Sequence, residues 1–170
     1  VALSPSGDFA LVADYTYDVI RHIDVASGVV TTIAGASNVA GSTDGVGENA
    51  RFNAPSSICL VDHARVAFVT DYGTGRLRRI DVATGAVTTI AGSSSTTPVD
   101  GVGTNAQFHQ PKGVAATEDG STVFVTDFAG QRVRKVVVAT RTVTTLAGSG
   151  SVGSADGVGA NAQFYGPWGI

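Results

Sequence analysis

The chain repeats one sequence pattern three times at a constant spacing. The motif Asp-Gly-Val-Gly-x-Asn-Ala-x-Phe occurs every 56 residues, at Asp44–Phe52, Asp100–Phe108 and Asp156–Phe164. A second segment, Thr-Thr-Ile/Leu-Ala-Gly, repeats with nearly the same step, at Thr31–Gly35, Thr88–Gly92 and Thr144–Gly148. Self-similarity at a fixed period of this size is typical of solenoids, propellers and repeat arrays. The repeat therefore constrains the architecture strongly and the chemistry weakly.

Length and composition exclude several classes of protein. The 170 residues suffice for one ordinary domain, and 43% of them are hydrophobic, which is enough for a core. A net charge of −3 gives the chain as a whole no attraction to nucleic acid or to an anionic membrane. The single cysteine, Cys59, excludes an internal disulfide or a cysteine metal cage and fits a reducing compartment. We find no membrane-spanning run and no signal-peptide pattern, and we assign no localisation.

Each period contains short strand-forming segments separated by turns. In the second copy, Val66–Thr70 is a β-branched and aromatic run that ends at Asp71, and the basic segment Arg76–Ile80 follows it. A short strand after Pro-x-x and the Thr-Thr-Ile-Ala segment bring the number to four strands per period. Their connections are short, which predicts an antiparallel meander. Four-stranded units in series are typical of β-propeller blades.

The turn before the last strand of each period differs in the third copy. Asp24–Gly28 and Asp81–Gly85 both follow the pattern Asp-Val-Ala-Ser/Thr-Gly. In the third copy, Val137 replaces the aspartate and Arg141 replaces the glycine. Because glycine adopts positive φ more readily than arginine does, we expect this turn to be built differently.

Three features of the third copy together resemble NHL repeats: Pro111–Val114 (Pro-x-Gly-Val), the strand that ends at Asp127, and the basic strand Arg132–Val136. NHL repeats form β-propellers, most often with six blades. The resemblance implies an all-β fold of four-stranded antiparallel blades, of which this chain holds three. The repeat units would lie at about residues 1–57, 58–113 and 114–169.

Three blades do not close a ring of the usual four to eight. The chain begins and stops at the same point of the repeat, so we expect it to be part of a longer propeller. The partner that completes the ring would then be the remaining blades of a longer chain. A second copy of this chain is the alternative.

One side of the predicted blades carries the longest connections. In a four-stranded meander, the turn between the second and third strands emerges on the same side as the connection to the next blade. Loops of about twenty residues are uncommon in compact domains and tend to be functional. This side, which we call the loop face, is the predicted surface for a protein or peptide partner. Its short turns carry four candidate binding residues: Tyr15, Tyr17, Tyr72 and Phe128.

The Asp-Gly-Val-Gly motif admits two interpretations. Carboxylate, amide and backbone oxygens are ligands that calcium prefers, but each copy supplies only one carboxylate and one amide, such as Asp100 and Asn105. The alternative is a turn in which the aspartate bonds its own backbone and the glycines take positive φ. We favour the turn, and we predict no metal and no cofactor.

Aspartate ends the second strand of every copy, and arginine follows seven residues later in the third strand. Acidic residues near a propeller axis could supply a metal or catalytic site. Recurrence in every copy instead favours ion pairs that link neighbouring strands within each blade. These residues are Asp14, Asp71, Asp127, Arg21, Arg78 and Arg134. The recurring phenylalanines Phe52, Phe108 and Phe164 are predicted to pack between blades.

Other reactive residues show no functional pattern. His22, His63 and His109 fall at non-equivalent places in the repeat and form neither a metal-ligand spacing nor a triad, so we assign no catalytic residue. At the start of the repeat, Ser56, Lys112 and Trp168 occupy equivalent positions. Trp168 is expected either near the axis or exposed at the surface.

The sequence favours a non-enzymatic scaffold that binds a protein or peptide through its loop face. One alternative is part of an enzyme similar to propeller lyases and lactonases, with its metal site in further blades. Another is an RNA-binding NHL domain, and a third is a spacer or sensor domain. The RNA alternative rests on the charge of the basic strands: Arg76, Arg78, Arg79, Arg132, Arg134 and Lys135. Because the total charge is acidic, we expect no nucleic-acid partner and no membrane partner.

Overall fold

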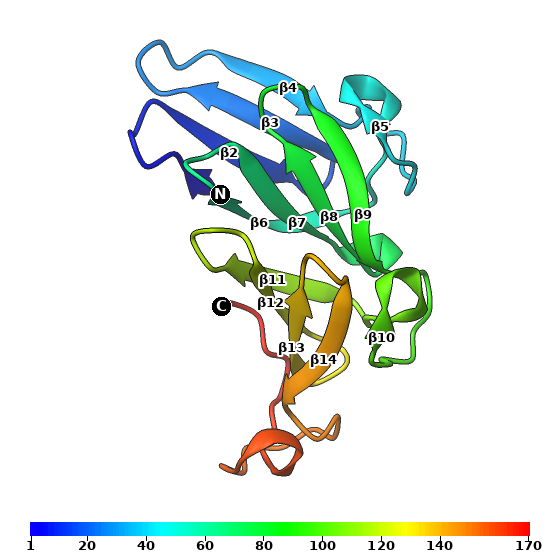
Figure 1. Ribbon diagram of the computed structural model, residues 1–170. Coiled ribbons are helices and arrows are strands. Elements are labelled where there is room, and N and C mark those ends of the chain that lie inside the picture. The colour runs from blue at the N-terminus through cyan, green and yellow to red at the C-terminus, as the bar shows by residue number, and fades with distance from the viewer.

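Three antiparallel β-sheets lie side by side, with the second sheet between the first and the third (Figure 1). The computed structural model describes residues 1–170. It contains the strands β1–β14 and four short 3-10 helices, η1–η4. Each sheet has the four-stranded antiparallel meander that the sequence predicts, and we call each sheet a blade.

The strands of each blade follow one another from the inner edge of the sheet to the outer edge. Blade 1 consists of β1 Ala2–Leu3, β2 Phe9–Asp14, β3 Val19–Asp24 and β4 Val30–Ala34. Blade 2 consists of β6 Pro55–Val61, β7 Val66–Asp71, β8 Arg76–Asp81 and β9 Ala86–Gly92. Blade 3 consists of β11 Pro111–Ala116, β12 Thr122–Asp127, β13 Arg132–Val137 and β14 Thr142–Ala147. Proline begins β6 and β11, a strand position at which it is tolerated.

A fifth strand at the outer edge of blades 2 and 3 comes from the preceding connector. β5 (Gly45–Val46) pairs with β9, and β10 (Gly101–Val102) pairs with β14, both antiparallel. Each is the Gly-Val of the Asp-Gly-Val-Gly motif. A 3-10 helix follows the motif in all three copies: η1 Gly47–Asn49, η3 Gly103–Asn105 and η4 Gly159–Asn161. The remaining helix, η2 Tyr72–Thr74, lies in the turn between β7 and β8. This fifth strand, through which each connector joins the next blade, was not predicted from the sequence.

The turn before β14 keeps the left-handed last residue of its counterparts but is closed by a different hydrogen bond. The Arg141 amide donates to the Val138 carbonyl at 3.3 Å, whereas the Gly28 and Gly85 amides donate to the Asp24 and Asp81 carbonyls. The expected difference is therefore found in the hydrogen bonds of the turn and not in the conformation of its last residue. Gly28, Gly85 and Arg141 have φ values of 70°, 68° and 56°. The carbonyls of Gly85 and Arg141 accept hydrogen bonds from the amides of Gly47 and Gly103, at 3.0 and 2.9 Å. Because the connector bonds to the turn at this carbonyl, the geometry is kept although a left-handed conformation is unfavourable for arginine.

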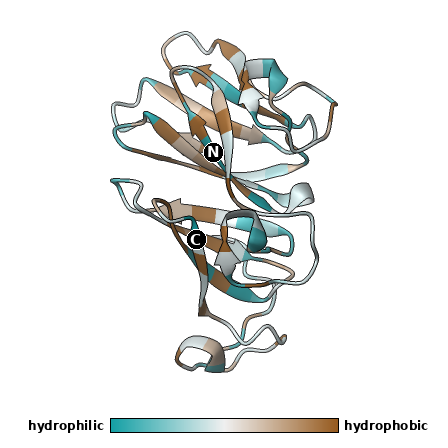
Figure 2. Cartoon of the chain, turned by 45° about the vertical axis from the view of Figure 1, so that its right-hand side comes forward, coloured by the Kyte–Doolittle hydropathy of each residue, from teal (hydrophilic) through white to brown (hydrophobic).

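Apolar side chains are buried mainly between neighbouring blades. One core combines residues of blades 1 and 2, such as Leu11 and Val69, around Phe52. The other combines residues of blades 2 and 3 around Phe108. Both phenylalanines are 0% exposed. Figure 2 shows hydrophobic segments along the strands of all three blades. Each blade is therefore held chiefly by its neighbour, as expected of a repeat protein.

We expect Phe108→Ala to lower the free energy of unfolding by about 3–5 kcal/mol, because the ring is fully buried and its removal leaves a cavity. Tyr72→Ala, on the loop face, should change it by much less because Tyr72 is only half-buried. Urea denaturation of both variants measures the two effects. If Tyr72→Ala cost more than Phe108→Ala, the assignment of core and surface would be wrong.

We expect Arg141→Gly to raise the free energy of unfolding by about 0.5–1 kcal/mol, because glycine relieves the left-handed strain but loses more backbone entropy. Gly28→Ala in the equivalent turn of blade 1 is the matched control. A methyl group there meets no atom within 4 Å, so the variant should be destabilised by backbone strain alone. Thermal denaturation compares the variants, and a lower melting temperature for Arg141→Gly would contradict the interpretation.

Candidate functional site

A cavity of about 380 Å³ opens on the loop face where the inner strands β6 and β11 begin. These two strands pack beside each other, so the cavity lies between blades 2 and 3 at the inner edge of the sheets. Its lining combines the starts of the inner strands with one turn of blade 1 and the last residues of the chain. The lining residues are Tyr15, Ser56, Ser57, Lys112, Gly113, Trp168, Gly169 and Ile170.

Lys112 is the charged residue of this cavity, and its ammonium lies among three aromatic rings. Nζ is 3.1 Å from the ring centroid of Trp168, 4.7 Å from that of Phe128 and 5.2 Å from that of Tyr72. Such cation–π contacts contribute about 0.5–2 kcal/mol each. No carboxylate forms an ion pair with Lys112. Partial burial lowers the pKa of Lys112. We call these four residues the lysine site.

Two threonines fix the backbone that carries the lysine site. Thr70 Oγ1 donates a hydrogen bond to the Lys112 carbonyl at 2.7 Å, and Thr126 Oγ1 donates one to the Trp168 carbonyl at 3.0 Å. Each threonine is the second-to-last residue of its strand, β7 or β12. The end of the second strand in one blade therefore positions the first segment of the next.

The structure places two of the four predicted binding residues, Tyr72 and Phe128, in this site, and a third, Tyr15, beside it. The ring centroids of Tyr15 and Tyr72 lie 5.9 Å apart, and Phe128 meets Trp168 edge-on at 5.6 Å. Tyr17, the fourth, is exposed and contacts none of these rings. One turn from each of the three blades thus contributes an aromatic ring in the site or beside it.

Lys112 was not among the binding residues predicted from the sequence. It lies at the start of a strand, whereas the candidates were chosen among residues of the turns. The signal that would have found it is its place in the repeat, which it shares with Ser56 and Trp168. All three line the same cavity.

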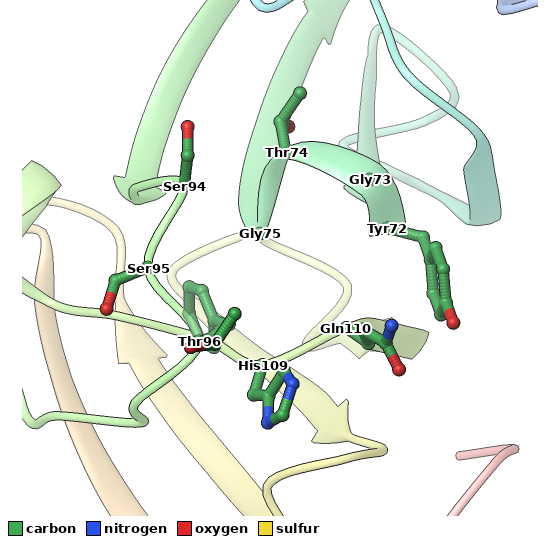
Figure 3. A pocket seen from close by; sticks show the side chains of 10 residues that line it. Tyr72, Gly73, Thr74, Gly75, Ser94, Ser95, Thr96, His109 and Gln110 are labelled. Atoms are coloured by element: carbon green, nitrogen blue, oxygen red, sulfur yellow. The ribbon is translucent and has the colours of Figure 1, made fainter.

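A smaller cavity of about 130 Å³ lies beside the lysine site on the loop face (Figure 3). Three segments form it: Tyr72–Gly75, Ser94–Thr96 and Phe108–Gln110. In Figure 3, Tyr72 and Gln110 lie on one side of this cavity, and Ser94 and Ser95 lie on the other. Tyr72 belongs to both the lysine site and this second cavity, so the two places are adjacent.

Below the loop face, one buried arginine binds both its own blade and the preceding connector. Arg78 Nη1 donates to Asp71 Oδ2 at 3.2 Å and to the Arg51 carbonyl at 2.8 Å. Its Nη2 donates to Asp44 Oδ1 at 2.9 Å and to the Thr43 carbonyl at 3.1 Å. The Arg78 side chain is 0% exposed. We call this arrangement the arginine junction.

Blade 3 contains a second arginine junction with the same contacts. Arg134 Nη1 donates to Asp127 Oδ2 at 2.9 Å and to the Gln107 carbonyl at 3.0 Å. Its Nη2 donates to Asp100 Oδ1 at 2.7 Å and to the Val99 carbonyl at 3.0 Å. Each junction contains the ion pair that the sequence predicts within the blade. The connector aspartate adds a second ion pair to the same arginine.

The aspartate of the Asp-Gly-Val-Gly motif does not bond its own backbone, so that part of the turn interpretation is wrong. Asp44 Oδ1 accepts from the Thr89 hydroxyl at 2.8 Å, and Oδ2 accepts from the Thr89 amide at 3.0 Å. Asp100 makes the same two contacts with Thr145, at 2.9 and 3.0 Å. The pairing of β5 and β10 with the next blade brings each carboxylate to these donors, which replace the local backbone donors.

Burial raises the pKa of the inner carboxylates. The pKa of Asp71 rises to about 6, although hydrogen bonds from Thr74 and Asn53 and the charge of Arg78 act in the opposite direction. Burial also raises the pKa of Asp127.

The outer carboxylates shift in the other direction. Partial burial would raise the pKa of Asp44 and Asp100, but the hydrogen bonds from Thr89 and Thr145 and the arginine charges outweigh it, so both pKa values are lowered. The connector therefore supplies the carboxylate that stays ionised most readily beside each buried arginine.

The recurring residues of the first blade and of the last connector are more exposed than their counterparts in the middle of the chain. Phe164, in the last connector, is only half-buried, unlike Phe52 and Phe108. In blade 1, Arg21 Nε lies 3.4 Å from Asp14 Oδ2, and both side chains are partly exposed.

The basic strands bury part of their positive charge. Arg78 and Arg134 are fully buried, and Nη1 of Arg76 is buried as well. Two of the six charges on which the RNA alternative rests therefore lie inside the blades, and the other four side chains are partly exposed.

No group of three or more histidine, cysteine, aspartate or glutamate side chains is arranged to hold a metal ion. Burial raises the pKa of the Cys59 thiol to about 11, so the thiol is protonated at neutral pH and is a poor nucleophile. None of the helices has the length and apolar character that crossing a membrane requires.

Comparison with known sequences gives relatives for the whole chain. No family model matches it. Protein SUPPRESSOR OF QUENCHING 1, chloroplastic, from Arabidopsis thaliana is 28% identical over 100% of the chain, which covers 17% of that protein. NHL repeat-containing protein 2 from Bos taurus is 26% identical over 79% of the chain, which covers 20% of that protein. The chain thus spans a fifth or less of the length of these curated relatives.

Solved structures share the fold. A structural genomics protein of unknown function from Bacteroides thetaiotaomicron superposes with a TM-score of 0.77 and 24% identity, covering 100% of this chain and 40% of that chain. An auxiliary nutrient binding protein from the same organism gives 0.74 and 18%, with 99% and 41% covered. A chain of a nidogen/laminin complex gives 0.62 and 14%, with 86% and 46% covered. The chain is a β-propeller repeat protein with relatives among NHL repeat proteins.

We expect Asp100→Asn to lower the melting temperature at neutral pH, because Arg134 and Thr145 lose a charged acceptor. The lowered pKa of Asp100 means that its ionisation stabilises the fold above about pH 4 and that this contribution is lost as the pH falls further. The difference in melting temperature from the wild type should therefore shrink on acidification. Glu118→Gln, an exposed carboxylate on the opposite face, is the control. A difference that stays constant down to about pH 2.5 would contradict the assignment.

Proposed function

We propose that this chain is a binding scaffold whose lysine site takes an acidic segment of a protein or peptide. The observation that carries the proposal is the Lys112 ammonium, which lies at the edge of a cavity, is framed by three rings and has no carboxylate partner. In the blade interiors, by contrast, every buried arginine is paired with two carboxylates. Lys112 is therefore a cation at a cavity whose charge is free to meet a ligand.

The chemistry of the site favours a carboxylate beside an apolar group. A carboxylate ligand would give Lys112 its missing counter-charge through a charge-assisted hydrogen bond. Trp168 is 64% exposed, so its ring offers apolar contact area next to that charge. Aromatic side chains of this kind often anchor partners at protein interfaces. Side chains of Glu or Asp flanked by small apolar residues fit both features.

The comparisons support a binding role for the fold and not a particular ligand. Similar structures include an auxiliary nutrient binding protein and a chain of a nidogen/laminin complex. We further propose, from the resemblance to NHL repeats, that the complete ring has six blades. Neither the enzyme alternative nor the RNA alternative gains an observation of its own from the residues described above.

Trp168 is the single tryptophan of the chain, so its fluorescence reports directly on the lysine site. We expect a saturable change in Trp168 fluorescence when the protein is titrated with a hexaglutamate peptide, and none with hexaglutamine. The change should weaken in about 0.5 M NaCl, because salt screens the attraction between the peptide and Lys112.

Lys112→Gln should weaken hexaglutamate binding by about tenfold or more, because it removes the charged partner. Lys135→Gln on β13 is the matched control, since Lys135 is the other lysine of the chain and lies away from the cavity lining. It should bind the peptide as the wild type does. Equal responses to hexaglutamate and hexaglutamine, or unchanged binding by Lys112→Gln, would refute the proposal.

A further inference from the structure

One backbone amide on the loop face lacks the acceptor that its counterparts have. The Ala54 amide donates to Asp18 Oδ1 at 2.7 Å, and the Gly166 amide donates to Gln131 Oε1 at 2.6 Å. Gln110 stands at the same place of the repeat, but its amide makes no hydrogen bond within the chain. The middle copy therefore has the donor of this contact without an acceptor.

The acceptor is absent because a glycine stands opposite the amide. Gly75 occupies the position of Asp18 and Gln131, and the three residues share a left-handed backbone, with φ values of 62°, 59° and 53°. Gln110 also shares the backbone of its two counterparts, with a φ of 58° against 54° and 61°. The Gln110 N–H thus faces a place where blade 2 has no side chain.

A side chain cannot be added at Gly75 without a shift of the backbone. A Cβ there would lie 2.7 Å from the Ser93 carbonyl oxygen and 2.9 Å from the Phe108 carbonyl oxygen, which is too close. The smaller cavity of about 130 Å³ lies at this place, and both Gly75 and Gln110 line it (Figure 3). The acceptor for the Gln110 amide must therefore come from outside the chain.

The connector that passes this cavity also takes a path of its own. In the first and last connectors, the amides of Gly41 and Gly153 donate to the carbonyl of the recurring phenylalanine, at 2.9 and 3.1 Å. A Cβ at either glycine would collide with a neighbouring side chain, and the middle connector has Thr97 at this position. The Thr97 amide donates to Ser95 Oγ at 3.3 Å instead, which leaves the Phe108 carbonyl without a donor.

Polar groups without partners surround the cavity. The side chains of Tyr72, Ser94, Thr96 and His109 line it and make no hydrogen bond within the chain, and no carboxylate, lysine or arginine is among the lining residues. The volume is several times the about 30 Å³ that one water occupies, and it is below the about 300–1,000 Å³ of cavities that enclose a whole ligand. The cavity therefore has room for the end group of a ligand.

The chemistry of the cavity favours a carboxamide over a carboxylate. Either group can accept from this amide, since Asp18 carries a carboxylate and Gln131 carries a carboxamide. An anion would find no lysine or arginine here and would lie close to the carbonyl oxygens of Ser93 and Phe108. A carboxamide is neutral and has two N–H donors beside its oxygen, so it suits a site with free hydroxyl oxygens.

We propose that this cavity is a subsite for a primary carboxamide. The oxygen of the bound group accepts from the Gln110 amide, as the side chains of the other two copies do, and its NH2 donates to the hydroxyl oxygens of Ser94 and Thr96. The group comes from an asparagine or glutamine side chain of a polypeptide or from a small amide, and the two sources share this chemistry. The proposal does not rest on the lysine site, because an uncharged ligand does not need the charge of Lys112.

NMR of the backbone amides tests the contact directly. In a sample labelled with ¹⁵N-glutamine, the amides of Gln107, Gln131 and Gln163 serve as references, because they donate within the chain at 2.9, 3.4 and 2.9 Å. The signal that is lost in Gln110→Asn belongs to Gln110. We expect acetamide to move the Gln110 amide proton downfield in a saturable manner, because the proton gains an acceptor. Acetate at the same concentration should move it less.

Two blocked peptides distinguish the sources of the carboxamide. Acetyl-Gly-Gln-Gly-N-methylamide carries the group on a side chain, and acetyl-Gly-Ala-Gly-N-methylamide lacks it and should leave the Gln110 signal in place. If the glutamine peptide saturates the shift at a lower concentration than acetamide does, the subsite serves a polypeptide. If acetamide binds as well as the peptide, the subsite serves a small amide.

A pair of neighbouring variants tests the location. Thr96→Phe places a ring at the cavity and should raise the dissociation constant of acetamide by at least about fivefold, because the ring clashes with the ligand. Thr97→Phe is the matched control, since Thr97 is exposed and lies outside the lining, and it should bind as the wild type does. A Gln110 signal that does not move, an equal shift with acetate, or equal binding by the two variants would each overturn the proposal. None of these results depends on the hexaglutamate titration, so the two proposals can fail separately.

Discussion

The buried guanidinium of each arginine junction needs hydrogen-bond partners from two separate parts of the chain. Arg78 binds a carboxylate of its own blade and a carboxylate with two carbonyls from the connector, through its two terminal nitrogens. Its Nε has no partner, and the same holds for Arg134. Removing one partner of a buried ion pair costs about 3–5 kcal/mol. The connector must therefore return to the arginine, and the fifth strand and the buried phenylalanine lie where this return places them.

The repeat made the fold predictable because its signals are local. Strand-forming runs, short turns and the constant period predicted three antiparallel sheets of the propeller type, and the structure has them. The fifth strand was missed because β5 joins a partner about forty residues away, and no local pattern marks this pairing. The same distance explains the wrong interpretation of Asp44, whose donors lie in the next blade. The turn at Arg141 has different internal hydrogen bonds, as expected, but it keeps the left-handed conformation because a contact from the connector overrides the local preference for glycine.

The binding site was predictable only in part, for a different reason. Tyr15, Tyr72 and Phe128 were selected because their turns lie on the loop face, and the strand order alone gives that face. The structure brings Tyr72 and Phe128 to Lys112, and Tyr15 to Tyr72, because equivalent turns of adjacent blades converge at the inner edge. Tyr17 comes from the same turn as Tyr15 but remains outside the site, because strand order does not fix the direction of a side chain within a turn.

Recurring and varying positions of the repeat have separate tasks in this structure. The recurring aspartates, arginines and phenylalanines form the junctions, where every copy needs the same contacts. Ser56, Lys112 and Trp168 occupy one backbone environment in three successive copies, yet they differ in charge and size. Thr70 and Thr126 hold the carbonyls of Lys112 and Trp168, not their side chains. The side chain at this position can therefore differ between copies without loss of these backbone hydrogen bonds. In the proposed binding role, the three side chains at this position determine which kind of ligand fits the cavity. The arginine junctions keep the spacing between the blades, and so between these side chains, constant.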